Sequence, residues 1–188
     1  MQPTPPDVSD DDEVVHWFLR LDIGVGPRGL SENSALLSDM GYGDAKMWIT
    51  MDGAWMFHER VGAGLWLGLN RRSGGAESSD QRGVEVVSWF IGAELPILLA
   101  GNRAWALQLT PRAGYATGRI HFTNFSGNSA GSFQHTGTFG GAFSFQSFLA
   151  HVGASIALMH SPAGPPGKYG RNMDYGGFYF SLNGTIDD

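Results

Sequence analysis

The chain has 188 residues and a formal net charge of -6 at pH 7, and only 16% of its residues are charged. This length suits one domain with a sizeable core, and an acidic chain without a basic patch is a poor candidate for binding nucleic acid. The lack of cysteine excludes a disulfide framework and thiolate chemistry. The sequence has no run of about 18 apolar residues, so we predict no membrane-spanning helix.

Residues 1–13, MQPTPPDVSDDDE, are rich in proline and in acidic side chains. They have neither the basic start nor the apolar stretch of a signal peptide, so we expect a flexible acidic segment. If the protein is exported, we expect that a signal preceding this segment has been removed. We treat residues 14–188 as one domain.

From Trp17 onward, apolar and polar residues alternate with a period of two, which is the periodicity of a β-strand and not of a helix. In Trp17–Val25, WFLRLDIGV, the apolar side chains share one face, whereas Arg20 and Asp22 lie on the other. The same alternation predicts eight strands, at residues 17–25, 46–57, 62–71, 84–97, 105–118, 135–145, 151–159 and 175–188.

Long and short connections alternate between these strands. We expect residues 99–104 and 146–148 to be short links and Arg119–Ser132 to be a loop. The long loops centre on Ser31–Gly43, Gly74–Gln81, Asn124–Gly131 and Ala163–Asn172. Such alternation is typical of an up-and-down antiparallel meander, and eight strands of about ten residues can close into a barrel that crosses a membrane. We therefore predict an all-β, eight-stranded antiparallel up-and-down transmembrane β-barrel over residues 14–188.

The two faces of the strands favour a membrane barrel over a soluble one. A soluble barrel has an apolar interior and a polar exterior, but here the polar face is mostly Gly, Ser, Thr and Ala, which is poor for a solvated exterior. The apolar face is too rich in Trp, Phe and Leu for a narrow lumen, and it carries aromatic residues near strand ends, as interfacial girdles do. We predict that lipid contacts Leu19, Ile49, Leu67, Trp89, Leu107, Phe143, Ile156 and Phe180.

The inward face combines charged and bulky residues. Its charged residues are Arg20, Asp22, Lys46, Asp52, Glu94 and Arg112, and its bulky residues are Phe18, Trp48, Trp66, Phe90 and Tyr179. Charges in a confined lumen must be paired or hydrated, and pairing of the first two strands places Arg20 opposite Asp52. We favour a structural cluster of ion pairs that fills the barrel. A gated conduit or a proton-linked site is the alternative.

This pattern resembles the bacterial eight-stranded outer-membrane β-barrel proteins of the OmpA-, OmpX- and OmpW-like group. The family's C-terminal insertion signal has a spacing that Tyr175, Gly177, Phe180 and Leu182 match. The resemblance implies a Gram-negative bacterium, insertion by the barrel-assembly machinery, and a place in the outer membrane. The partners implied are outer-membrane lipid and lipopolysaccharide, with another envelope protein as a further candidate. An even number of strands returns the chain to its starting side, so we expect both termini to be periplasmic.

His121 and Thr123 form the one pair that suggests catalysis. They resemble the His-x-Ser pair of outer-membrane lipid A deacylases, in which an imidazole activates a hydroxyl. No orienting carboxylate is evident nearby, so a histidine in a polar external loop is the preferred interpretation. The other histidines show no metal-ligand spacing, and we expect neither a metal nor a cofactor.

The function that these observations favour is a non-enzymatic outer-membrane barrel with a side-chain-filled lumen, which anchors surface loops or a partner assembly. A narrow, OmpW-like conduit for small solutes is the first alternative. A lipid-modifying outer-membrane enzyme that uses His121 is the second.

Overall fold

The computed structural model describes residues 17–26, 45–75, 83–102, 104–123, 133–163 and 173–187. Residues 1–16, which include the predicted acidic segment, and most of the predicted long loops lie outside these ranges. The regular elements are all strands: β1 (Trp17–Gly26), β2 (Ala45–His58), β3 (Val61–Gly75), β4 (Gly83–Glu94), β5 (Ile97–Asn102), β6 (Trp105–Thr123), β7 (Phe133–Ser147), β8 (Val152–His160), β9 (Pro162–Ala163), β10 (Met173–Asp174) and β11 (Gly177–Asp187). None of the described residues forms a helix long and apolar enough to span a membrane.

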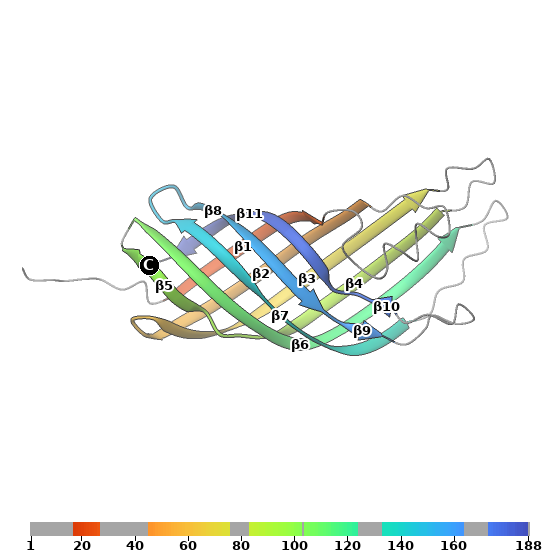
Figure 1. The fold of residues 1–188 in the computed structure, drawn as a ribbon, viewed down its shortest axis with the longest axis horizontal. Helices are drawn as coiled ribbons and strands as arrows, with labels where there is room; N and C mark the ends of the chain where they lie inside the picture. The colour runs from red at the N-terminus through yellow and green to blue at the C-terminus, as the bar shows by residue number, and fades with distance from the viewer. Residues whose placement is uncertain are drawn as a thin grey trace, which may run out of the picture.

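The strands close into an antiparallel barrel (Figure 1). The main sheet has nine strands in the order β2-β1-β11-β8-β7-β6-β4-β3-β5, and an additional pairing of β2 with β3 closes it. β4 and β5 are two parts of one barrel strand, interrupted at Leu95 and Pro96, and both parts pair with β3 and β6. The barrel is therefore eight-stranded, which confirms the predicted fold. β9 and β10 form a separate two-stranded ladder.

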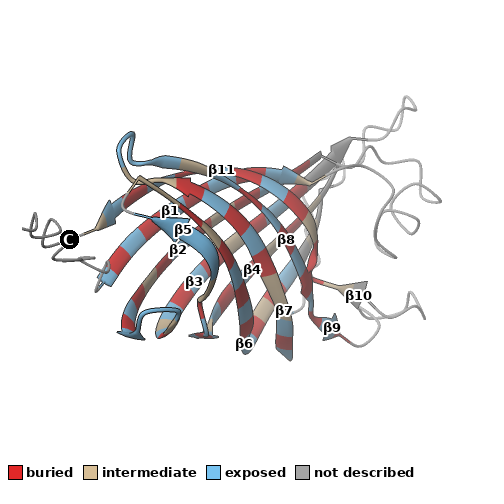
Figure 2. Cartoon of the chain, turned by 60° about the vertical axis from the view of Figure 1, so that its left-hand side comes forward, coloured by how far each residue is buried: buried red, intermediate tan, exposed pale blue. Residues whose placement is uncertain are grey.

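Burial follows the alternation of the sequence. Along β1 every second residue is buried (Figure 2), and the buried set includes Arg20 and Asp22 while Leu19, Leu21 and Ile23 are exposed. This is the reverse of a soluble barrel and the arrangement of a transmembrane one, in which apolar side chains face lipid and polar ones face the lumen.

Several strands are longer than predicted. β3 continues to Gly75, and β6 continues to Thr123, so the start of the segment predicted as a loop, Arg119–Thr123, is strand. The predicted short link at residues 99–104 is also wrong over most of its length, because β5 runs to Asn102. β7 likewise extends to Ser147. These additional residues remain paired with the neighbouring strands, although the alternation of polar and apolar side chains is weaker there. Pairing persists because the hydrogen bonds between strands join backbone atoms, which are the same for polar and apolar residues.

One end of the barrel carries the short turns and both ends of the described chain. Phe18, near the start of β1, pairs with Asp187 at the end of β11, and Trp17 pairs with Trp55, close to the β2–β3 turn. The connections that lie outside the described residues leave from the opposite end, with Arg103 as the exception (Figure 1). We call this opposite end the loop end.

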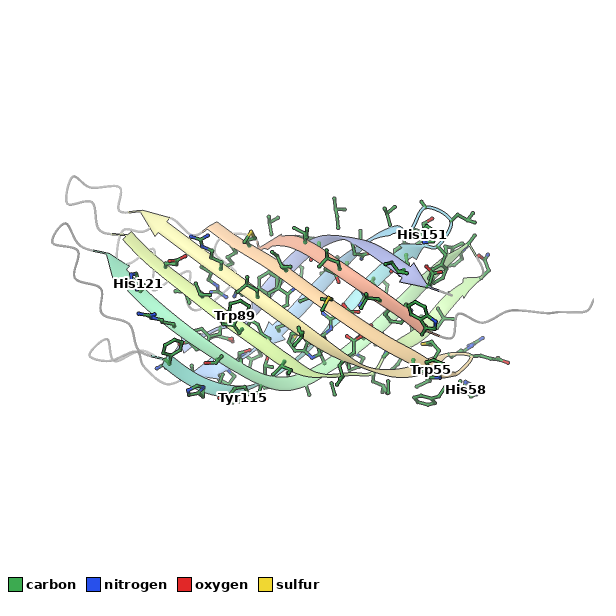
Figure 3. The ribbon with its side chains drawn as sticks, turned by 180° about the vertical axis from the view of Figure 1, so that it is seen from behind. Trp55, His58, Trp89, Tyr115, His121 and His151 are labelled. Carbon is green, nitrogen blue, oxygen red and sulfur yellow. The ribbon has the colours of Figure 1, made fainter. Side chains whose placement is uncertain are left out.

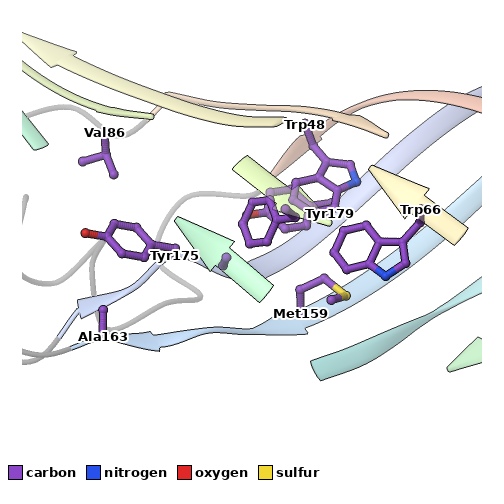
Figure 4. Packing of buried hydrophobic residues seen from close by; sticks show 9 residues of the cluster. Trp48, Trp66, Val86, Met159, Ala163, Tyr175 and Tyr179 are labelled. Carbon is purple, nitrogen blue, oxygen red and sulfur yellow. The ribbon is translucent and has the colours of Figure 1, made fainter. Parts of the chain in front are cut away.

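Bulky aromatic side chains pack together inside the barrel toward the loop end, and Figure 4 shows Trp48, Trp66 and Tyr179 of this cluster. Trp48 stacks on Tyr179 with ring centroids 4.3 Å apart and contacts Phe90 at 5.2 Å. Trp66 is fully buried and fits against Gly92, where a Cβ atom would come within 2.7 Å of the indole nitrogen. A second, smaller cluster of Phe18, Ala54 and Met56 lies toward the short-turn end. The inward direction predicted for Phe18, Trp48, Trp66, Phe90 and Tyr179 is confirmed.

Candidate functional site

A chain of buried ion pairs crosses the lumen between the two apolar clusters. Arg20 on β1 pairs with Asp52 on β2 at 2.8 Å and with Asp22 at 3.3 Å. Arg112 on β6 pairs with Asp52 and with Glu94 on β4, each at 2.9 Å. These five side chains, all buried, are called the lumen network below. The predicted register of Arg20 with Asp52 is confirmed.

Neutral polar groups connect the lumen network to other strands. Asp22 accepts hydrogen bonds from Ser155 on β8 at 2.7 Å, and from Thr50 and Asn183 at 3.3 Å each. Arg20 donates to Ser144 on β7 at 3.1 Å. The network therefore joins strands from around the barrel, and removing either arginine would leave more buried carboxylates without a compensating cation.

The lumen network has a formal excess of one acidic group. It contains the carboxylates Asp22, Asp52 and Glu94 but only the guanidinium groups of Arg20 and Arg112, so its formal charge is one unit negative. The Oε1 atom of Glu94 is buried and has no hydrogen-bond partner among the described residues. Glu94 is thus the carboxylate of the network with the fewest polar contacts among the described residues, since Arg112 alone contacts it.

Lys46, the sixth charge of the predicted cluster, is buried elsewhere. It lies on β2 near the loop end, where its register partner on β3 is Arg72. Arg72 was missed by the sequence analysis, which ended the third strand at residue 71. The alternation itself offered the signal, because Arg72 continues the inward series of Trp66, Gly68 and Asn70.

Tyr175, in the connection between β10 and β11, closes the lumen at the loop end. Its phenol donates a hydrogen bond to Gln134 at 2.7 Å, and its backbone carbonyl accepts one from Asn70 at 2.8 Å. Arg72 donates to the carbonyl of the next residue, Gly176. Burial raises the pKa of the Tyr175 phenol to about 12. Gly118 makes room for the ring, because a Cβ atom there would lie 2.4 Å from it.

The four residues of the predicted insertion signal have different environments. Tyr175 is fully buried at the loop end, and Gly177 begins β11 with φ of 148°, which is accessible to glycine. Phe180 and Leu182 point outward and are 48% and 74% exposed. Their role in membrane insertion stays a prediction.

The eight residues predicted to contact lipid all lie on the outer face. Six are exposed, whereas Ile49 and Leu107 are half-buried between neighbouring side chains. Exposed aromatic side chains occur toward both ends of the barrel, with Trp55 near the short turns and Trp89 and Tyr115 toward the loop end (Figure 3). Contact with lipid itself stays a prediction.

His121 lies on strand β6 and not in an external loop, so that part of the sequence analysis was wrong. A carboxylate is closer than the sequence suggested, because Glu85 on β4 is the register partner of His121. Glu85 is engaged by Arg71, however, at 2.6 Å. The side chain of Thr123 lies outside the described residues. Over the part of the chain that the structure describes, no group of three His, Cys, Asp or Glu side chains is placed to hold a metal ion.

No family model and no curated protein matches the sequence. Among solved structures, the chain is similar to Ail, the attachment invasion locus protein of Yersinia pestis, with a TM-score of 0.55, 12% identity, and coverage of 91% of this chain and 97% of Ail. The same protein in complex with the heparin analogue sucrose octasulfate matches with the same TM-score and identity, over 91% of this chain and 99% of that one. The chain has the fold of the eight-stranded outer-membrane β-barrels.

A weaker likeness links this barrel to the N-terminal β-barrel domain of Pseudomonas aeruginosa OprF. The TM-score is 0.45 and the identity 11%, over 93% of this chain and 98% of that domain.

Proposed function

We propose that the protein is a non-enzymatic barrel of a bacterial outer membrane, which anchors its long loops or a partner assembly at the cell surface. The observation that carries this proposal is that successive layers of side chains fill the lumen. From the short turns to the loop end, these are the Phe18 cluster, the lumen network, the aromatic cluster around Trp48, and Tyr175. An eight-stranded barrel has an interior just wide enough for side chains to fill.

The outer face supports membrane insertion. Its exposed residues include Leu65 at 71%, Leu158 at 61% and Phe180 at 48%, and large apolar surfaces of this kind are rare on soluble monomers. Outer-membrane lipid, lipopolysaccharide included, is therefore the partner proposed for the outer wall, and another envelope protein is a candidate partner for the loops.

We propose that the short-turn end, with both termini, faces the periplasm and that the loop end faces outward. Long extracellular loops and short periplasmic turns are the rule for such barrels. Protease added to intact cells should cut within Ser31–Gly43 or Asn124–Gly131 and spare residues 7–15. Cleavage of residues 7–15 before the loops would show the opposite orientation.

Planar-bilayer recording tests the filled lumen against a narrow conduit for small solutes. The wild-type protein should give no steady single-channel currents. A Trp48→Ala/Tyr175→Ala variant, which removes two of the largest inward side chains, serves as the opened control. Steady and reproducible currents from the wild type would overturn the filled-lumen proposal and favour the conduit.

The lipid-modifying alternative is tested separately. Purified protein should release no fatty acid from lipid A, and the His121→Ala variant should behave identically. Release that the wild type shows and His121→Ala lacks would make the protein an enzyme.

A further inference from the structure

The outer wall of the barrel has a hollow of about 370 Å³ near the loop end, between strands β4, β6 and β7. Its lining changes character along the barrel axis. Trp89 and its register partner Thr117 form the side toward the middle of the barrel, and Glu85 and its partner His121 form the side toward the loops. Val87 and Arg119 lie opposite each other between these two pairs. Figure 3 shows Trp89 on this wall with His121 beyond it toward the loop end. The hollow therefore spans the change from an apolar to a polar outer surface.

The polar side of the hollow carries a positive charge that pairs with no carboxylate among the described residues. Glu85 is the acidic residue of the lining, and it is paired with Arg71 at 2.6 Å. Arg119 has no ion pair with a carboxylate of any described residue; its guanidinium carbon lies 5.3 Å from the ring centroid of Phe133. A cation–π contact of this kind orients the planar group without neutralising it.

We propose that this hollow binds a phosphate-bearing lipid of the outer leaflet. Arg119 binds the phosphate, because a guanidinium group presents paired N–H donors that match its oxygens. His121 lies two residues further along the same strand face and supplies a second donor, while an acyl chain lies along Trp89 and Val87. The phosphorylated headgroup of lipid A has the required chemistry.

A free anion or a soluble protein fits the hollow less well. Half of the lining is apolar and lies on the wall that the proposed function places against the membrane. A lipid there brings an apolar chain beside the apolar part of the hollow and a charged headgroup beside the polar part. The inference rests on that proposed function, because the loop end must face the outer leaflet.

The test uses the full-length protein in phosphatidylcholine nanodiscs that contain lipid A, with retained lipid A measured by native mass spectrometry after partial removal of the lipid. Arg119→Gln should lower retention about tenfold, which corresponds to the loss of a charged hydrogen bond. Arg60→Gln is the matched control, because it removes the same charge from an exposed turn at the opposite end of the barrel, and it should retain lipid A like the wild type.

Two further retention measurements identify the ligand. Dephosphorylated lipid A should be retained no better by the wild type than by Arg119→Gln, and inorganic phosphate should not displace lipid A. Equal retention of lipid A by Arg119→Gln and Arg60→Gln, or full retention of the dephosphorylated lipid, would overturn the inference. Displacement of lipid A by inorganic phosphate would likewise overturn the inference, because the hollow would then be a site for a simple anion. Failure of the protein to insert into the bilayer would instead refute the proposed function itself.

Discussion

Replacing Arg112 with methionine should destabilise the barrel more than a substitution that leaves the charge of the lumen network unchanged. Arg112 binds Asp52 and Glu94 at 2.9 Å each, and its guanidinium carbon lies 5.5 Å from the ring centroid of Trp66. Methionine keeps much of the packing volume but removes the cation, so the network changes from one to two units of excess negative charge. Removing one partner of a buried ion pair costs about 3–5 kcal/mol of unfolding free energy.

A double-mutant cycle with Glu94→Gln separates charge from packing. Glu94→Gln alone balances two carboxylates against two guanidinium groups, so its effect on unfolding free energy should stay within about 1 kcal/mol. The double variant returns to one unit of excess negative charge, and it should be more stable than Arg112→Met alone by roughly 1–3 kcal/mol.

The measurement is urea unfolding of the protein in lipid vesicles, followed by tryptophan fluorescence and by the mobility of the folded form in unheated gels. The reasoning fails if Arg112→Met unfolds at the wild-type urea concentration. It also fails if the double variant is no more stable than Arg112→Met, because the cost would then come from lost packing and not from uncompensated charge.

Three further changes test other parts of the barrel. Arg20→Ala leaves Asp22 and Asp52 without their shared cation and should lower the unfolding free energy by about 3–5 kcal/mol in the same assay, whereas no loss would argue that water compensates them. Leu67→Arg places a charge on the outer wall and should cost roughly 2–4 kcal/mol in vesicles if the site is near mid-membrane, with Leu67→Ala as control; equal stability of the two would argue against contact with lipid. Gly118→Val should displace the Tyr175 ring and cost about 1–3 kcal/mol. Near-ultraviolet circular dichroism should show the displacement, and an unchanged spectrum would mean that the ring is not held there.

The sequence alone was enough to predict the strands and the faces of their residues. Side-chain direction in a strand is a local property that alternates at every residue, so Arg20, Trp48 and Tyr179 could be placed inside, and Leu19 and Phe180 outside, without knowledge of the strand order. The ends of the strands were harder to predict from the sequence. Arg72 and Arg119–Thr123 were taken as loop because the outward face there carries the polar residues Arg71, Arg119 and His121 in place of apolar ones. The alternation continues, but the apolar outer face by which the strands were recognised ends before the ladder does.

The contacts within the lumen needed the closed barrel. Arg20 and Asp52 could be matched from adjacent strands, but Arg112 meets Asp52 from 60 residues further along the chain, and Ser155 meets Asp22 from 133 residues away. Such contacts depend on barrel closure and on the registers of all the strands between them.

The same limit applies at the loop end. Tyr175 was assigned from the sequence to an insertion signal, and its burial against Gly118 became evident only when the connection before β11 was seen to enter the lumen. His121 was given no carboxylate, yet the register of β4 with β6 places Glu85 opposite it. The alternation of residues along each strand thus determined which way the side chains point, and the tertiary structure decided which of them meet, because contacts across a barrel join residues that no local pattern relates.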